Sequence, residues 1–126
     1  MKNEELISKA QSLVKPMSLS RDGMDACTVG CALLTKDGNV YTGICFHVSC
    51  GIGICAEHAA IAEMLKNGEK EIKVIVATSQ SGILSPCGRC RELMIQLDSN
   101  NKETKIILKD GSEKTLNELL PDHWLM

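Results

Sequence analysis

Pro86-Cys87-Gly88-Arg89-Cys90-Arg91 decides the fold class of this chain, because it places two thiols three residues apart where a loop enters a helix. An apolar strand is predicted over residues 73–78, and a helix beginning at the proline is predicted over residues 86–97. Cys87 and Cys90 then project from one side of the first helical turn and can share a metal ion. The partial positive charge of a helix N-terminus lowers the pKa of a thiol and favours the thiolate that binds metal.

A second stretch, Cys55-Ala56-Glu57-His58, begins another predicted helix over residues 54–65. Cys55 supplies a third thiol if the two helix ends face each other. Three protein ligands plus a water are typical of a catalytic zinc site, whereas structural sites are closed by four ligands. Cys-x-Glu followed by Pro-Cys-x-x-Cys also matches the pattern of zinc deaminases, in which the glutamate acts as acid and base. The two stretches together therefore predict a catalytic zinc site with Cys55, Cys87 and Cys90 as ligands and Glu57 beside them.

The rest of the chain predicts helices and strands in alternation. Hydrophobic period and turn residues indicate a helix over 4–14, a polar loop over 18–25, a hairpin with strands over 28–34 and 40–48, a strand over 105–108, and a short helix after the capping-box sequence Thr115-Leu116-Asn117-Glu118. This order favours an α/β fold with a mostly parallel or mixed sheet covered by helices. We expect a single domain over residues 1–126.

Composition excludes several classes of function. The chain has 126 residues, a formal net charge of −2 and a pI near 5.9, so no positive field draws it to nucleic acid or anionic lipid. Its three aromatic residues, Tyr41, Phe46 and Trp124, cannot tile a base-stacking groove. No apolar run reaches the ~18 residues of a membrane span, and the N-terminus lacks the apolar stretch of a secretory signal. We expect a cytoplasmic protein with no general affinity for nucleic acid or membranes.

The seven cysteines leave two alternatives open. Because the number is odd and a reducing compartment disfavours disulfides, cysteines outside the zinc set are interpreted as small hydrophobes. One alternative is a structural zinc module for assembly, in which His47 or Cys50 closes the site as a fourth ligand and Glu57 has no role. The other is a redox protein in which Cys87 and Cys90 form a reversible disulfide.

The chain resembles the small cytidine deaminase family and, through residues 82–91, is most similar to the blasticidin S deaminases within it. Val29-Gly30-Cys31-Ala32-Leu33 resembles the family's first core strand, and Glu118-Leu119-Leu120-Pro121 resembles its C-terminal signature. The resemblance implies a three-layer α/β/α sandwich with a five-stranded sheet, a homotetramer and one zinc ion per subunit. It also implies hydrolytic deamination of a small cytosine-containing substrate to uracil, with release of ammonia.

Roles for individual residues follow from the motifs and the resemblance. Glu57 would take a proton from the attacking water, deliver it to N3 of the cytosine, and later protonate the leaving amine. Arg91 and His58 lie in helical register with Cys87 and Cys55, so they would donate to thiolate sulfurs and offset their charge. The resemblance implies further substrate contacts from Ala56, Ser85 and Pro86, and from Trp124 near an adjoining subunit. A tail aromatic that only anchors the C-terminus is the other interpretation of Trp124.

One segment departs from the family's pattern. Nucleoside-specific members carry Asn-x-Glu on the strand before the zinc segment to bind the ribose hydroxyls, whereas this chain has Cys45-Phe46-His47. A pocket built to hydrogen-bond a hydroxyl discriminates strongly, so the loss of those groups predicts weak use of plain cytidine. We therefore expect a cytosine derivative with an altered sugar or an amine-bearing group, such as blasticidin S, beside Cys45, Phe46 and His47.

Overall fold

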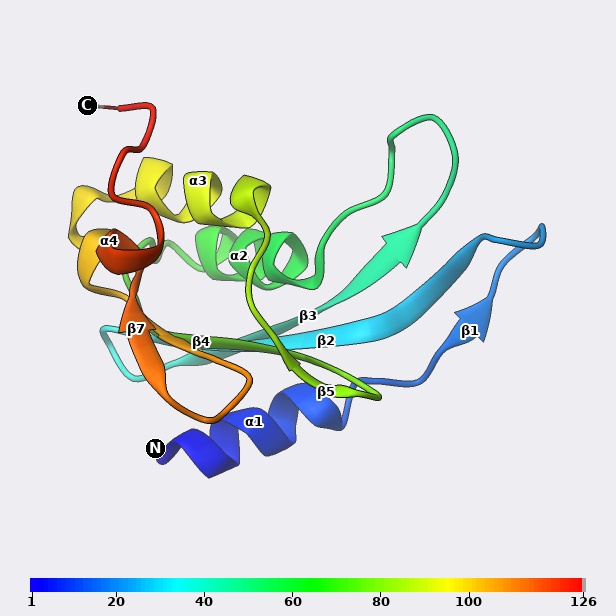
Figure 1. The fold of residues 1–126 in the computed structure, drawn as a ribbon, viewed down its shortest axis with the longest axis horizontal. Coiled ribbons are helices and arrows are strands. Elements are labelled where there is room, and N and C mark those ends of the chain that lie inside the picture. The colour runs from blue at the N-terminus through cyan, green and yellow to red at the C-terminus, as the bar shows by residue number, and fades with distance from the viewer. Residues whose placement is uncertain (126) are drawn as a thin grey trace.

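The computed structural model describes residues 1–125 and shows an α/β fold in three layers (Figure 1). α1 covers one face of the sheet, and α2, α3 and α4 lie over the other face. The helices are α1 (Asn3–Gln11), α2 (Ala56–Lys66), α3 (Gly88–Leu97), the 3-10 helix η1 (Ser99–Glu103) and α4 (Leu116–Leu119). The strands are β1 (Met17–Ser18), β2 (Asp25–Thr35), β3 (Val40–His47), β4 (Ile72–Ser79), β5 (Gly82–Leu84), β6 (Lys105–Ile107) and β7 (Glu113–Thr115).

The sheet is mixed and has seven strands, in the order β1-β2-β4-β6-β7, with β3 paired to β2 and β5 paired to β4. Within residues 1–125 the one parallel pairing is that of β4 with β6, and the other pairings are antiparallel. The predicted α/β/α layering around a mixed sheet is confirmed. The sheet has seven strands where five were expected, and most of its pairings are antiparallel where most were expected to be parallel. The crossover through α2 places β4 beside β2, the first strand of the hairpin, so β4 runs antiparallel to its neighbour.

Aliphatic side chains fill the core on both sides of the sheet. On β4, Val74 and Val76 pack in the cluster that contains α1, whereas Ile75 and Ala77 pack in the cluster that contains α2 and α3. Cys31 on β2 is fully buried, as expected of a cysteine that serves as a small hydrophobe. Because central strands are covered on both faces, they read as continuous apolar runs.

Two glycines let helices lie close against the sheet. A Cβ at Gly43 on β3 would lie 2.5 Å from the carbonyl oxygen of Ala56 and 2.7 Å from Cβ of Ala59, both on α2. A Cβ at Gly30 on β2 would meet the carbonyl oxygen of Ala10 at the end of α1, on the opposite face. Gly43 therefore sets how closely the first turns of α2 approach β3.

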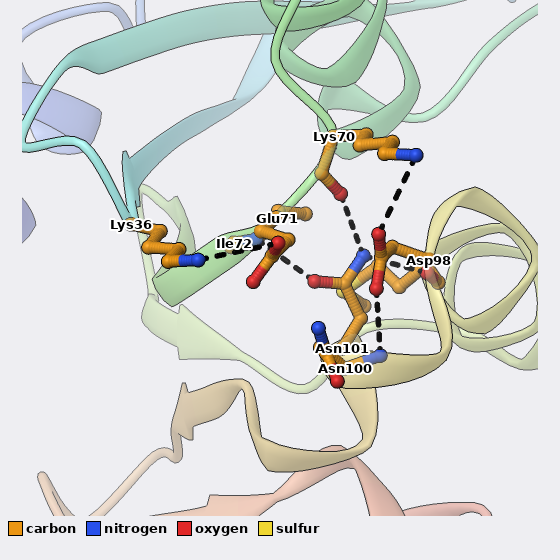
Figure 2. Close-up of polar contacts among 8 residues, drawn as sticks. Lys36, Lys70, Glu71, Ile72, Asp98, Asn100 and Asn101 are labelled. Atoms are coloured by element: carbon orange, nitrogen blue, oxygen red, sulfur yellow. Dashed lines mark hydrogen bonds and ion pairs between the residues drawn. The ribbon is translucent and has the colours of Figure 1, made fainter.

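Asn101 on η1 joins three backbone segments through its side chain (Figure 2). Its side chain is 1% exposed, and its Oδ1 accepts a hydrogen bond from the Ile72 N–H at 2.8 Å. Its Nδ2 donates to the carbonyl oxygens of Lys70 and Met94, both at 2.9 Å. The buried amide thus ties the beginning of β4 to α3 and η1.

Several element ends differ from the sequence-based expectation. The first helix ends at Gln11, and the third begins at Gly88, so Pro86 lies in the preceding loop. The capping box is confirmed, since Thr115 and Glu118 each accept a hydrogen bond from the other's backbone N–H. No helix within residues 1–125 is long and apolar enough to span a membrane.

Candidate metal centre and active site

The candidate site lies where the N-terminal ends of α2 and α3 come together above the sheet (Figure 1). Cys55 is the N-cap of α2 and Cys87 is the N-cap of α3; both have extended backbone and neither side chain makes a capping hydrogen bond. Most N-cap side chains accept a bond from the first helical turn, but a thiol accepts only weakly. Both thiols are thus left available to a ligand between the two helix ends.

The thiol spacings fit a tetrahedral ion. The sulfur of Cys87 lies 3.7 Å from that of Cys55 and 3.4 Å from that of Cys90. Two thiolates bound to one zinc ion at tetrahedral angles lie about 3.8 Å apart, because Zn–S bonds are about 2.3 Å long. The donor set therefore suits Zn²⁺ in chemical type and in spacing.

The imidazole of His58 lies next to the candidate ligands. Its Nδ1 is 3.4 Å from the sulfur of Cys90. The donor atoms of Cys55, His58 and Cys90 all lie within 4.8 Å of one another and form a group that could hold a metal. Helical register paired His58 with Cys55, whereas the structure places its Nδ1 beside the sulfur of Cys90 on α3, where it can donate a hydrogen bond to a thiolate or serve as a further ligand. Neither His47 nor Cys50 belongs to this group.

Ionisation of the thiols differs between the three cysteines. Burial raises the pKa of Cys55, and burial together with the nearby Glu57 carboxylate raises that of Cys90. At Cys87 burial acts in the same direction, but the backbone N–H of Cys90 and further hydrogen bonds outweigh it, and the pKa is lowered. Only a bound cation makes three adjacent thiolates favourable, so this donor set is suited to a metal.

Glu57 lies in the first turn of α2 and is 6% exposed. Burial raises the pKa of its carboxyl above the ordinary value, which favours the protonated form. Its side chain lines a cavity of about 150 Å³ together with Cys55 and Cys87. A carboxyl whose protonated form is favoured by burial thus lines the same small space as the candidate ligands. Burial, followed by the charge of Arg89, lowers the pKa of His58.

The structure brings most of the predicted substrate-contacting residues to this cavity. Its lining includes Ala56, Ser85, Cys45 and His47, whereas Pro86 lines a smaller adjacent void with Glu57. Cys45 is buried, and its sulfur lies 3.2 Å from Oγ1 of Thr28. The cavity also has an apolar lining from Val29, Ala77 and Leu84, to which the sequence analysis assigned no contact with substrate.

Arg91 is placed differently from its predicted position beside a thiolate. Its Nε donates to the carbonyl oxygen of Pro86 at 2.9 Å, and Nη1 donates to that of Leu119 at 3.2 Å. The guanidinium therefore fastens the turn before Cys87 to α4. Helical register predicts the direction in which the Arg91 side chain leaves the helix, but not which atoms its guanidinium contacts.

The surroundings of Phe46, Trp124 and His47 differ from one another. Phe46 lines a neighbouring cavity. Trp124 is 79% exposed, and its backbone N–H donates to the Glu92 carboxylate at 3.0 Å. His47 is held by Asp25, whose carboxylate lies 2.8 Å from Nδ1 of the imidazole. Sequence reasoning missed Asp25, and the only signal was strand register, which places it opposite His47.

Thiol donors spaced for zinc around a cavity with a buried glutamate are characteristic of zinc-dependent hydrolases, and the chain is of this class. The sequence model of the cytidine and deoxycytidylate deaminase zinc-binding region matches residues 1–105. The chain belongs to this deaminase family, whose members are hydrolases acting on C–N bonds, and zinc is its cofactor.

Individual relatives agree with the family. The chain is 34% identical over 121 residues to a cytidine deaminase of Halalkalibacterium halodurans, covering 88% of this chain and 90% of the relative. It is 31% identical over 113 residues to a blasticidin-S deaminase of Bacillus cereus, covering 74% of each chain. The crystal structure of cytidine deaminase from Mycobacterium tuberculosis superposes with a TM-score of 0.81 at 27% identity, covering 98% of both chains.

Proposed function

We propose that the protein hydrolyses the amino group from the cytosine ring of a small nucleoside-like substrate, giving uracil and ammonia. The observation that carries this proposal is the position of Glu57, buried and lining one cavity with Cys55 and Cys87. Zinc, when bound, supplies a water acidic enough to be a nucleophile near neutral pH. Glu57 accepts the proton of that water, passes it to N3 of the ring, and later delivers a proton to the departing amine.

The proposed ligands are Cys55, Cys87 and Cys90. His58 then donates a hydrogen bond to the sulfur of Cys90, which reduces the charge that three thiolates place on the metal. Arg91 acts as a positioning residue, because its hydrogen bond to the Pro86 carbonyl oxygen fixes the backbone just before the ligand Cys87. Contacts to the cytosine ring are assigned to Ala56, Ser85 and Pro86. Contacts to the sugar part of the substrate are assigned to Cys45, Phe46 and His47. If His58 binds the metal as a fourth ligand, the zinc site is closed and structural. The alternative function is then that of a zinc-binding assembly module without deaminase activity.

The finer identity of the substrate follows from the strand before the zinc segment. Cys45 and His47 line the cavity where Asn-x-Glu would bind ribose hydroxyls in nucleoside-specific members. We propose a cytosine derivative with an altered sugar, and the similarity to the blasticidin-S deaminase of Bacillus cereus makes blasticidin S one candidate. We further propose one domain over residues 1–126, a cytoplasmic location, and a homotetramer in which the exposed Trp124 packs near a neighbouring subunit's site.

The test compares Glu57→Gln with Glu63→Gln, a control on an exposed turn of the same helix. Ammonia release is measured with cytidine, deoxycytidine, cytosine and blasticidin S. Glu57→Gln should retain zinc and fold but lose about 10²–10⁴-fold in kcat, the usual contribution of a proton-transferring group. Glu63→Gln should behave as wild type. Full activity in Glu57→Gln would refute the catalytic role, and a zinc-loaded wild type inactive on every compound would support the structural alternative.

A further inference from the structure

Cys87 and Cys90 form a close pair of thiols with very unequal exposure. Cys87, the N-cap of α3, is exposed to solvent, whereas Cys90 in the first turn of α3 is 0% exposed. Their sulfurs lie 3.4 Å apart, closer than the 3.7 Å between the sulfurs of Cys87 and Cys55. A reagent that arrives from solvent therefore meets Cys87 first and finds Cys90 directly behind it.

The backbone around this pair is held in place on both sides. The Arg91 N–H donates to the Cys87 carbonyl oxygen at 3.0 Å, so Cys87 and Cys90 belong to one formed helical turn. The Arg91 guanidinium holds the Pro86 carbonyl oxygen just before the pair. A disulfide places its sulfurs about 2.05 Å apart, so the two sulfurs must approach by about 1.4 Å. Side-chain rotation within one turn can supply this approach, whereas a Cys55–Cys87 bond would have to join two helices.

The other cysteines differ from this pair in having no neighbouring thiol. Within residues 1–125 the sulfur–sulfur contacts are those of Cys87 with Cys55 and with Cys90, and none involves Cys27, Cys31, Cys45 or Cys50. Cys50 is exposed like Cys87, so it shows what exposure alone does to a thiol of this chain. In reducing compartments, disulfides are usually transient and serve catalysis or redox sensing. Exposure and a buried partner on the same turn together mark Cys87 and Cys90 for this chemistry.

We propose that Cys87 and Cys90 are a site of reversible oxidative modification, at which a small-molecule disulfide such as oxidised glutathione oxidises the zinc-free protein. The Cys87 thiolate attacks one sulfur of the small disulfide, which forms a mixed disulfide and releases one small thiol. The Cys90 thiolate then attacks the Cys87 sulfur, forms the Cys87–Cys90 disulfide and releases the second small thiol. The two protons of the protein thiols end on the two released thiols, and the two electrons of the pair reduce the small disulfide.

This modification and zinc binding exclude each other. Metals bind the thiolate form of cysteine, and a disulfide has no thiolate to offer. Oxidation leaves Cys55 as the one thiol of the proposed ligand set, whereas a catalytic zinc site uses three protein ligands. Bound zinc, in turn, occupies both sulfurs and protects them. The modification is thus a reversible block on metal loading, and it rests on the proposed ligand set and not on deamination.

The test treats the full chain with oxidised glutathione, in the presence of either a chelator or zinc, and maps disulfides by mass spectrometry after alkylation and trypsin digestion. Trypsin cuts after Arg89, so Cys87 and Cys90 fall on separate peptides, residues 74–89 and 90–91. The zinc-free protein should yield these two peptides joined by a disulfide, and dithiothreitol should separate them and restore zinc binding. With free zinc at 100 times its dissociation constant, the product should form about 100-fold more slowly, because only the zinc-free fraction reacts.

Three variants separate the two steps of the exchange. Cys90→Ser should stop at a mixed disulfide of glutathione with Cys87, and Cys87→Ser should leave the buried Cys90 unmodified. Cys50→Ser is the matched control, which removes an exposed thiol without a partner and should form the wild-type product at the wild-type rate.

The wild-type protein alone can overturn the inference. It fails if the zinc-free chain gives no joined product, if peptide 74–89 is joined instead to peptide 37–66 that carries Cys55, or if zinc does not slow the reaction. These outcomes do not depend on catalysis. If no cytosine compound is deaminated, the proposed function fails, while the joined peptides still decide whether Cys87 and Cys90 are a site of oxidation.

Discussion

Gly43→Ala tests how the sheet positions the site. The new Cβ would lie 2.5 Å from the Ala56 carbonyl oxygen and 2.7 Å from Cβ of Ala59, whereas ordinary contact begins at 3.4 Å. The first turns of α2 must therefore move by about 1 Å, and we expect the free energy of unfolding to fall by about 1–3 kcal/mol, as overpacking usually costs. Cys55 and Glu57 lie on the part of the helix that moves, so zinc affinity should fall and kcat should drop about 100-fold.

Gly30→Ala is the matched control, because its Cβ meets the Ala10 carbonyl oxygen on the opposite face of the sheet. It should lose a similar amount of stability but keep zinc affinity and kcat. Urea unfolding measures the stability of both variants. Chelator competition and ammonia release, at a temperature where both are folded, measure the site. The reasoning is refuted if Gly43→Ala keeps wild-type kcat, or if Gly30→Ala loses it to the same extent.

Two further predictions concern groups away from the site. A hydrogen bond to the Glu69 carboxylate, helped by burial, raises the pKa of Tyr41 to about 12, so the folded state holds this proton and loses stability as pH rises from about 10 through 12. Absorbance titration of this single tyrosine should show the raised midpoint, and Glu69→Gln should return it toward about 10; an unchanged midpoint would contradict the assignment. Asn101→Ala leaves the Ile72 N–H without its partner and should cost about 1–3 kcal/mol in urea unfolding. The exposed Asn100→Ala should cost less than about 0.5 kcal/mol, and equal losses in both variants would rule out the buried hydrogen bonds as the cause.

The long elements of the fold could be predicted from sequence, as could the short strand β6 and the capped helix α4, whereas three other short strands could not. The predicted strand over residues 73–78 lies within β4, and the predicted helix over 54–65 overlaps α2. Both segments are long enough for their apolar residues to show a pattern, a continuous run in the strand and a helical period in the helix. β1, β5 and β7 have two or three residues, too few to show a period. Whether β4 runs parallel or antiparallel to its neighbours could not be predicted from sequence either, since it depends on which strand it pairs with.

In the candidate site, contacts within one helix could be predicted from sequence, whereas contacts between distant elements could not. Cys87 and Cys90 could be placed together from their spacing on one helical turn, and the structure has their sulfurs 3.4 Å apart. The pairing of Asp25 with His47 could not be foreseen, since the two residues are joined only by the register of β2 and β3. Arg91 was assigned to the correct helix face, but the carbonyl oxygens it contacts come from a loop and from α4.

By itself, the sequence predicted the reactive groups of this site: thiols at two helix starts, a glutamate two residues after the first thiol, and a strand end, Cys45-Phe46-His47, in place of the family's Asn-x-Glu. Tertiary structure alone decided that the N-termini of α2 and α3 meet, that Glu57 is buried and lines one cavity with Cys55 and Cys87, and that His47 pairs with Asp25. The physical reason is the range of the forces involved. Helix and strand patterns report on neighbours a few residues apart, whereas the packing of distant apolar surfaces decides which ends of the chain share a cavity.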